Sequence, residues 1–207
     1  MWSWRKLSVT WGAVSLLALA LFAGAGEVLP VVALSALCHE IGHLTALALV
    51  KAPIEQIRLT AFGAEIRADT RYLPYGREIF CTLAGPAVNL ILAVILARVA
   101  GDYLLAGSNL FLGVFNLLPL PSLDGGRALH LAISWAADPL LADRVCRWVG
   151  LLCGGALAAG AFILVVRHGT GAFLLLGALG AFIPQLCRFV KHIGRRTEKE
   201  CSSLRAS

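Results

Sequence analysis

Six long apolar runs, separated by short stretches rich in charged and polar residues, dominate the chain. They cover Leu7–Gly26, Val28–Val50, Ile79–Ala100, Leu104–Pro119, Val145–Val166 and Thr170–Val190. A helix of about 20 apolar residues crosses the hydrocarbon core of a bilayer. The pattern predicts an all-α polytopic membrane protein with about six transmembrane helices. The first run follows Arg5 and Lys6 and also has the layout of a cleavable secretory signal, so its retention stays open.

Composition and charge extend this interpretation. Of the 207 residues, 58% are hydrophobic and only 14% are charged, and the mean hydropathy of +0.79 is outside the range of soluble globular domains. All of the 18 Lys and Arg except Arg98 and Arg167 fall on one side of the predicted membrane, which places both termini in the cytoplasm. This distribution, and not nucleic-acid binding, accounts for the net charge of +6. We expect one domain over residues 1–190 and a short basic cytoplasmic tail over 191–207, either solvated or against anionic lipid.

Between the second and third runs the hydrophobic pattern changes to a period of two. Apolar and polar residues alternate from Ile57 to Ala61 and again from Ala64 to Asp69, on either side of Gly63. Alternation of this kind around a turn predicts a small membrane-associated β-hairpin. The edge of the hairpin could accept an unwound segment of another protein as an added strand, or the hairpin could be an amphipathic surface ribbon. The sequence leaves both interpretations open.

Two histidines and a glutamate lie in the middle of the second run, in the order His39-Glu40-Ile41-Gly42-His43. On a helix, His39 and His43 share one face, with the spacing that lets two ring nitrogens bind one zinc ion, while Glu40 beside them can act as a general base. Each ionisable group at this depth costs about 2.5 to 3.5 kcal/mol, and such groups persist mainly where they face a cavity or a partner. The pattern favours a metal centre inside the membrane.

A catalytic zinc site usually has three protein ligands and one open position, so a third ligand must come from another segment. In the other runs and the turns next to them, Asp124 is the carboxylate at membrane depth, and it follows two prolines that end the fourth helix. Gly125 and Gly126 next to it allow a tight backbone turn. Taken alone, Asp124 is equally well explained as a turn residue at the membrane interface.

Depth gives an independent argument for Asp124. At 1.5 Å per residue, His39 and His43 lie about 16 and 22 Å below the outer end of their helix, just on the cytoplasmic side of the middle of a core about 30 Å thick. The fourth run goes in the same direction and breaks in the inner half of the membrane. Asp124 is then at a depth where it can meet both histidines, and irregular backbone there must be buried or line a wet cavity.

Three segments together, His39–His43, Leu83–Leu90 (LAGPAVNL) and Phe115–Gly126 (FNLLPLPSLDGG), resemble the site-2 protease family of intramembrane zinc metalloproteases. The resemblance covers residues 28–127. Within the family, the short six-span architecture is most similar to the sporulation-type subgroup, which releases membrane-tethered transcription factor precursors. It implies His39, His43 and Asp124 as zinc ligands and Glu40 as the base that activates water. It also implies that Asn116 positions substrate or stabilises the oxyanion.

The resemblance therefore predicts a zinc metalloendopeptidase in a cell membrane, expected to be bacterial, with a membrane-tethered protein as substrate and a regulatory membrane protein as a further partner. Members of the sporulation-type subgroup often continue into a nucleotide-sensing CBS domain, which has no counterpart in this sequence, so regulation of that kind is not expected. A divalent-metal transporter and a catalytically silent metal-binding protein are the alternatives. The transporter is disfavoured because the second half of the chain does not repeat the histidine-bearing run. The silent protein is disfavoured because Glu40 is retained.

Overall fold

The computed structural model describes residues 7–9, 28–60, 63–68 and 73–168. The chain divides into two compact units, the first ending at Leu117 and the second beginning at Leu118. Of the predicted elements, the sixth run and the basic tail lie outside the described residues, as do residues 10–26 of the first run.

Helix α2 (Val28–Leu49) matches the second apolar run and bears both histidines. One stripe of the helix faces inward, because buried residues recur every three or four positions, at Ser35, His39, Gly42 and Ala46. The helix stops where Lys51 adopts a left-handed backbone, with φ of 58°, a common way for a helix to end. The chain then turns into a strand.

A small sheet lies between α2 and α3 in the sequence. Strands β2 (Ile54–Thr60) and β3 (Gly63–Ala68) pair antiparallel, with Ile57 opposite Ile66, and a register irregularity falls between Ile54 and Gln56. Strand β1 (Leu7–Val9) pairs parallel to β2, which gives the order β1-β2-β3. The expectation that Leu7 begins a transmembrane helix is therefore wrong for these three residues. Their apolar-polar-apolar alternation suits a short strand that covers an otherwise open edge of β2.

Two further helices complete the first unit. Helix α3 (Tyr75–Ile95) continues as a π-helical turn, η2 (Leu96–Ala100), and α4 (Tyr103–Asn116) begins where the Asp102 side chain accepts a hydrogen bond from Leu105 N at 3.0 Å. The two prolines are expected to end the fourth helix with a break after Leu118, and α4 ends slightly earlier, at Asn116. A proline disfavours helical backbone at the residue before it, so Pro119 already limits the helix at Leu118.

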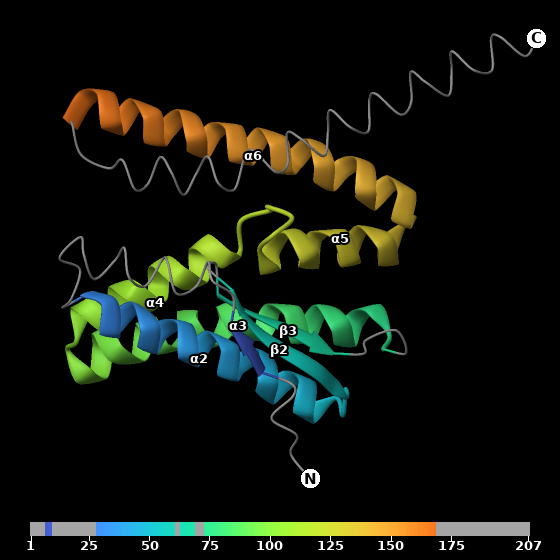
Figure 1. Ribbon diagram of the computed structural model, residues 1–207, viewed down its shortest axis with the longest axis horizontal. Coiled ribbons are helices and arrows are strands. Elements are labelled where there is room, and N and C mark those ends of the chain that lie inside the picture. Colours follow the sequence, from blue (N-terminus) through green and yellow to red (C-terminus); the bar gives the residue numbers. More distant parts are fainter. Residues whose placement is uncertain (1–6, 10–27, 61–62, 69–72, 169–207) are drawn as a thin grey trace, which may run out of the picture. The chain divides into compact units, whose positions relative to one another are not determined.

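Helices α2, α3 and α4 pack together, and each contacts the other two (Figure 1). Their inner faces meet at small residues: a Cβ added to Gly42 would lie 2.8 Å from Ala84 O, and one added to Gly113 would lie 3.3 Å from Asn89 Cβ. Their outer faces expose large apolar side chains, including Leu37, Ile91 and Phe111. Small residues inside and large apolar residues outside are typical of helices packed within a membrane.

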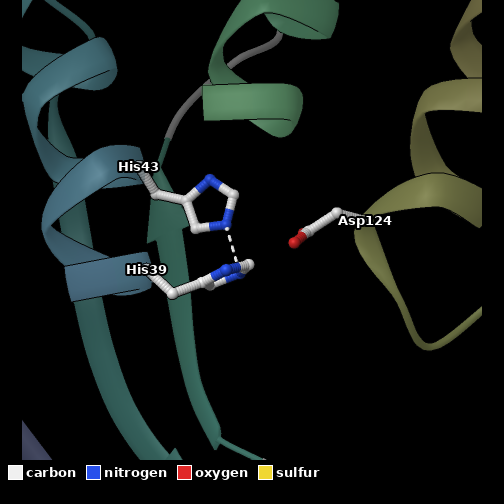
Figure 2. A group of neighbouring side chains, drawn as sticks. All are labelled: His39, His43 and Asp124. Carbon is white, nitrogen blue, oxygen red and sulfur yellow. Dashed lines mark hydrogen bonds between the residues drawn. The ribbon is translucent and has the colours of Figure 1, made fainter. Parts of the chain in front are cut away.

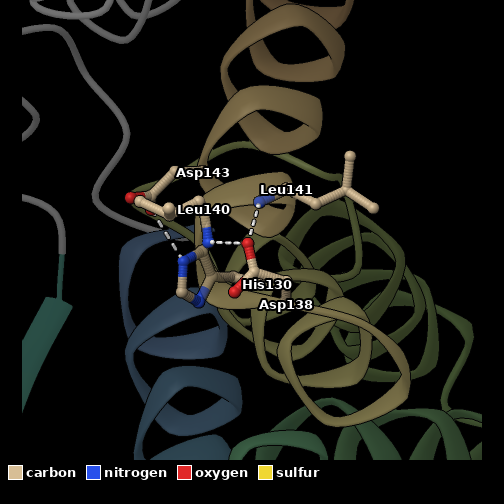
Figure 3. A network of polar contacts seen from close by, with 5 residues as sticks. All are labelled: His130, Asp138, Leu140, Leu141 and Asp143. Carbon is tan, nitrogen blue, oxygen red and sulfur yellow. Dashed lines mark hydrogen bonds and ion pairs between the residues drawn. The ribbon is translucent and has the colours of Figure 1, made fainter.

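The second unit contains helices α5 (Asp124–Ala136) and α6 (Pro139–His168). Asp138 caps α6 by accepting hydrogen bonds from Leu140 N and Leu141 N, and His130 Nε2 donates to Asp143 Oδ1 at 2.9 Å across the corner (Figure 3). The expected tight turn at Gly125 and Gly126 is not present, since both glycines lie in the first turn of α5. The sequence analysis did not predict this helix.

Within the described ranges, three helices are long and apolar enough to cross a membrane, namely Val28–Leu49, Tyr75–Ala100 and Pro139–Arg167. They correspond to the second, third and fifth predicted runs. Helix α4 is apolar but has only 14 residues. At 1.5 Å per residue it spans about 21 Å, less than a hydrocarbon core of about 30 Å.

Candidate metal centre

The two histidines of α2 lie on its inward face, one turn apart. His39 is 5% exposed and His43 is half-buried. The rings meet edge to face at 80°, with 4.8 Å between their centroids, and the two Nε2 atoms are 3.1 Å apart (Figure 2). The four-residue spacing on a helix therefore turns both Nε2 atoms toward one point, as the sequence predicted.

A backbone carbonyl of α3 fixes the ring of His43. His43 Nδ1 donates to Cys81 O at 2.8 Å, so the proton is on Nδ1 and the lone pair is on Nε2. Pro86 lacks an N–H, so it donates no backbone hydrogen bond to Thr82 O, the carbonyl next to that of Cys81. A hydrogen bond of this kind is the usual way in which a metal-binding histidine is oriented.

Gly85 on α3 keeps open the space between the two Nε2 atoms. A Cβ at this position would lie 2.3 Å from His43 Nε2 and 2.8 Å from His39 Nε2. Zinc binds imidazole nitrogen at about 2.0–2.1 Å, so two tetrahedral nitrogen ligands are about 3.3 Å apart. The 3.1 Å between the Nε2 atoms and the space above Gly85 fit such an ion.

The end of α4 is level with the histidines. Asn109 of α4 donates a hydrogen bond to Ser35 of α2 at 3.0 Å, and α2 and α4 run in the same direction (Figure 1). Seven residues, about two turns, lead from Ser35 to Gly42 and equally from Asn109 to Asn116. Asn116 is thus at the height of the histidine pair, where its Nδ2 donates to Leu112 O at 3.0 Å.

Asp124 belongs to the second unit, where it is the half-buried first residue of α5. Zinc sites commonly combine two imidazole nitrogens with one carboxylate oxygen, and Asp124 can supply the carboxylate. Figure 2 labels Asp124 and the two histidines. The chain leading to it is held by a turn in which Leu123 N donates to Leu120 O at 2.9 Å. A Cβ at Gly126 would lie 2.0 Å from the same Leu120 O, so this glycine is what allows the turn to pack on α5.

Glu40 follows His39 on α2 and is half-buried. The side chain of Glu40 projects from the same helical turn as His39, as the sequence predicted.

Sequence reasoning missed two contributors to the centre, Gly85 and the Cys81 carbonyl. Gly85 lies within Leu83–Leu90, one of the segments that carry the family resemblance, so the small residues of that segment were a usable signal. A backbone carbonyl has no sequence signal of its own.

Comparison with known proteins finds similarity to zinc metalloproteases. Residues 102–159 match the model of the family described as Peptidase family M50. The chain is 30% identical over 127 residues to the zinc metalloprotease MJ0392 of Methanocaldococcus jannaschii, which covers 56% of this chain and 37% of that protein. It is 29% identical over 171 residues to the putative zinc metalloprotease Rip3 of Mycobacterium tuberculosis, covering 76% of this chain and 42% of that protein.

The fold has a solved counterpart. The site-2 protease from Methanocaldococcus jannaschii superposes with a TM-score of 0.63 at 22% identity, over 89% of this chain and 92% of that one. With the apolar helices, these findings describe an integral membrane protein. The family match over residues 102–159 and the similarity to these zinc metalloproteases agree with the family expected from the sequence. It spans about two fifths of the length of the curated relatives named above.

Proposed function

We propose that the protein is an intramembrane zinc metalloprotease that hydrolyses a peptide bond of a membrane-tethered protein, in the cytoplasmic half of the bilayer. One observation carries the proposal. The Nε2 atoms of His39 and His43 converge to 3.1 Å over Gly85, with the His43 tautomer fixed by Cys81 O. Two neutral imidazoles held in this way inside apolar helices suit a divalent metal that binds nitrogen, and zinc is the metal named in the relatives.

Asp124 is the proposed third ligand. The connection between Asn116 and Asp124 has seven residues, so even fully extended it would place their Cα atoms at most about 29 Å apart. The turn at Leu120 shortens this reach, and Asn116 is level with the histidines. A carboxylate beside two imidazoles leaves a fourth position for water, as catalytic zinc sites require.

In this proposal each side chain of the site has its own chemical role. Bound zinc supplies Lewis-acid polarisation of a carbonyl and makes water acidic enough to lose a proton at neutral pH. Glu40 accepts that proton and delivers it to the leaving amine. Asn116 could turn its carboxamide from Leu112 O toward the substrate, to orient it or to stabilise the oxyanion. The substrate helix must unwind first, because its carbonyls are otherwise engaged in backbone hydrogen bonds.

The proposal also includes the architecture around the site. Residues 1–190 form one domain with six transmembrane helices, both termini are cytoplasmic, and the strand pair β2–β3 lies at the membrane surface. Edge strand β3 then offers backbone groups to an unwound substrate segment. The substrate is a tethered transcription factor precursor or an anti-sigma factor in a bacterial cell membrane.

The test uses the full chain in lipid vesicles, with a reporter whose single transmembrane helix carries a helix-breaking segment. Glu40→Gln is expected to keep zinc but to lower cleavage at least about 100-fold, because only the proton transfer is removed. Asp124→Ala is expected to lose zinc and cleavage together. Bound zinc is measured by elemental analysis and cleavage by release of the cytoplasmic tag.

Cleavage at the wild-type rate in Glu40→Gln would remove Glu40 from the mechanism. A full zinc content in Asp124→Ala would remove Asp124 from the ligand set. Zinc flux into the same vesicles without cleavage of any reporter would contradict the protease and support a transporter.

A further inference from the structure

Among the described residues of the first unit, three polar side chains are almost completely buried. Ser35, Asn89 and Asn109, one from each of α2, α3 and α4, are between 0% and 1% exposed. Polar groups buried among apolar helices are costly, and in native proteins they are nearly always hydrogen-bonded. The partners of each amide show which of them has a structural role.

Asn109 has a structural role. Its Nδ2 donates to Ser35 Oγ at 3.0 Å and to Leu105 O at 2.9 Å, and Ser35 Oγ donates to Val31 O at 3.0 Å. This chain of hydrogen bonds ties α4 to α2. Asn89 differs, because among the described residues none forms a hydrogen bond with either its Nδ2 or its Oδ1. Asn109 Oδ1 is likewise unpaired within the described part of the chain.

Asn89 lies close to the candidate metal centre. It follows Gly85 by four residues and shares the face of α3 that meets both histidines. Side chains of a helix lean toward its N-terminus, so the carboxamide leans from Asn89 back toward Gly85. Across the interface Gly113 packs closely against this part of α3, since a Cβ at Gly113 would lie 3.3 Å from Asn89 Cβ and 3.1 Å from Leu90 Cδ2.

We propose that Asn89 is a positioning residue of the metal centre, whose carboxamide holds a buried water molecule between α2, α3 and α4 and through it orients the ring of His39. The inference rests on the proposed function. A buried water needs two to four polar partners. Asn89 Nδ2 and Oδ1 offer a donor and an acceptor, and Asn109 Oδ1 offers a further acceptor one turn from Gly113. Groups that orient metal-binding histidines typically change metal affinity 10–100-fold when removed.

The test compares Asn89→Leu and Asn89→Ser in the full-length protein. Leucine has the branched shape of asparagine and no hydrogen-bonding group, so the melting temperature of the metal-free protein should stay level or rise, while zinc affinity falls about tenfold. Serine keeps a hydroxyl that can hold water, and should retain zinc affinity within about threefold of wild type. Asn109→Leu is a comparison for stability alone. It breaks paired hydrogen bonds and should lower the melting temperature of the metal-free protein.

Unchanged zinc affinity in Asn89→Leu would overturn the inference. A melting temperature that falls together with the affinity would also overturn it, because Asn89 would then be a packing residue. A failure of the proposed function is distinguishable, because the metal-free melting temperatures do not depend on catalysis. Wild-type protein that binds zinc without cleaving would fault the protease alone, while wild-type protein that binds no zinc would overturn both.

Discussion

The helices around His39 and His43 and the corner between α5 and α6 are stabilised by different kinds of contact. In the first region the helices meet at glycines, and the polar groups are buried or half-buried, with Cys81 O bonded to His43 and Asn109 bonded to Ser35. At the corner, the side chains of His130 and Asp143 are 38% and 55% exposed, and Asp138 is exposed as well (Figure 3).

The two regions therefore differ in how well they tolerate a substitution. A glycine packed against a ring or a carbonyl leaves no room for even one methyl group, and well-packed cores resist such insertion. Exposed hydrogen bonds are exchanged for water when a partner is removed, so their loss is cheap. We therefore expect substitutions at the glycines to affect metal binding strongly, and substitutions at the corner to affect only stability, and only slightly.

The largest effect is expected for Gly85→Ala. The new methyl carbon would lie 2.3 Å from His43 Nε2 and 2.8 Å from His39 Nε2, in the space that a bound ion would use. Zinc affinity, measured by competition with a chelator, should fall at least about 100-fold. Gly107→Ala in α4 is the control, because a Cβ there meets no atom within 4 Å, and it should leave zinc affinity unchanged. Equal affinities in the two variants would mean that Gly85 does not adjoin the metal.

An intermediate effect is expected for Gly126→Ala. A Cβ there would lie 2.0 Å from Leu120 O, so the turn before α5 must move and Asp124 moves with it. The free energy of unfolding should fall by about 1–3 kcal/mol, as is usual for overpacking. Zinc affinity should fall by about tenfold, as for other groups that orient a ligand.

Gly160→Ala in α6 is the matched control for this region. Its Cβ meets no atom within 4 Å, and alanine favours helix over glycine by up to about 1 kcal/mol. The control should therefore be neutral or stabilising. A stabilised Gly126→Ala variant with normal zinc affinity would show that the turn at Leu120 does not hold Asp124 in place.

The sequence predicted the elements that follow from local periodicity. The four-residue spacing in α2 was enough to predict the histidine pair, and the alternation of apolar and polar residues marked the region of β2 and β3. The contributions of Gly85 and Cys81 O were missed, because they arise from contact between helices more than 30 residues apart in the sequence and one of them is a backbone atom. The ligand role of Asp124 stays a prediction.

Helix α5 was missed for a different reason. Its first turn contains Gly125 and Gly126, and glycine is about 1 kcal/mol less favourable than alanine in a helix, so local propensity indicated a turn. The structure gives the reason for the exception, since Leu120 O packs where a side chain at Gly126 would be. Tertiary packing here overrides local preference. Span length was overestimated for α4 because the apolar run continues beyond Asn116 into residues that precede Pro119.

The smallest effect is expected at the α5–α6 corner, and it separates the two exposed contacts there. Asp138→Ala removes the acceptor of Leu140 N, at 3.1 Å, and of Leu141 N, at 3.3 Å, so it should cost about 1 kcal/mol of unfolding free energy, as loss of a helix cap does. His130→Ala removes only an exposed pair with Asp143, worth about 0–1 kcal/mol. Denaturant midpoints should therefore rank Asp138→Ala below His130→Ala, with zinc affinity normal in both. A loss of zinc affinity in either variant comparable to that of Gly126→Ala would contradict the distinction between the corner and the histidine-bearing core, because exposed contacts would then control the metal centre as strongly as buried ones.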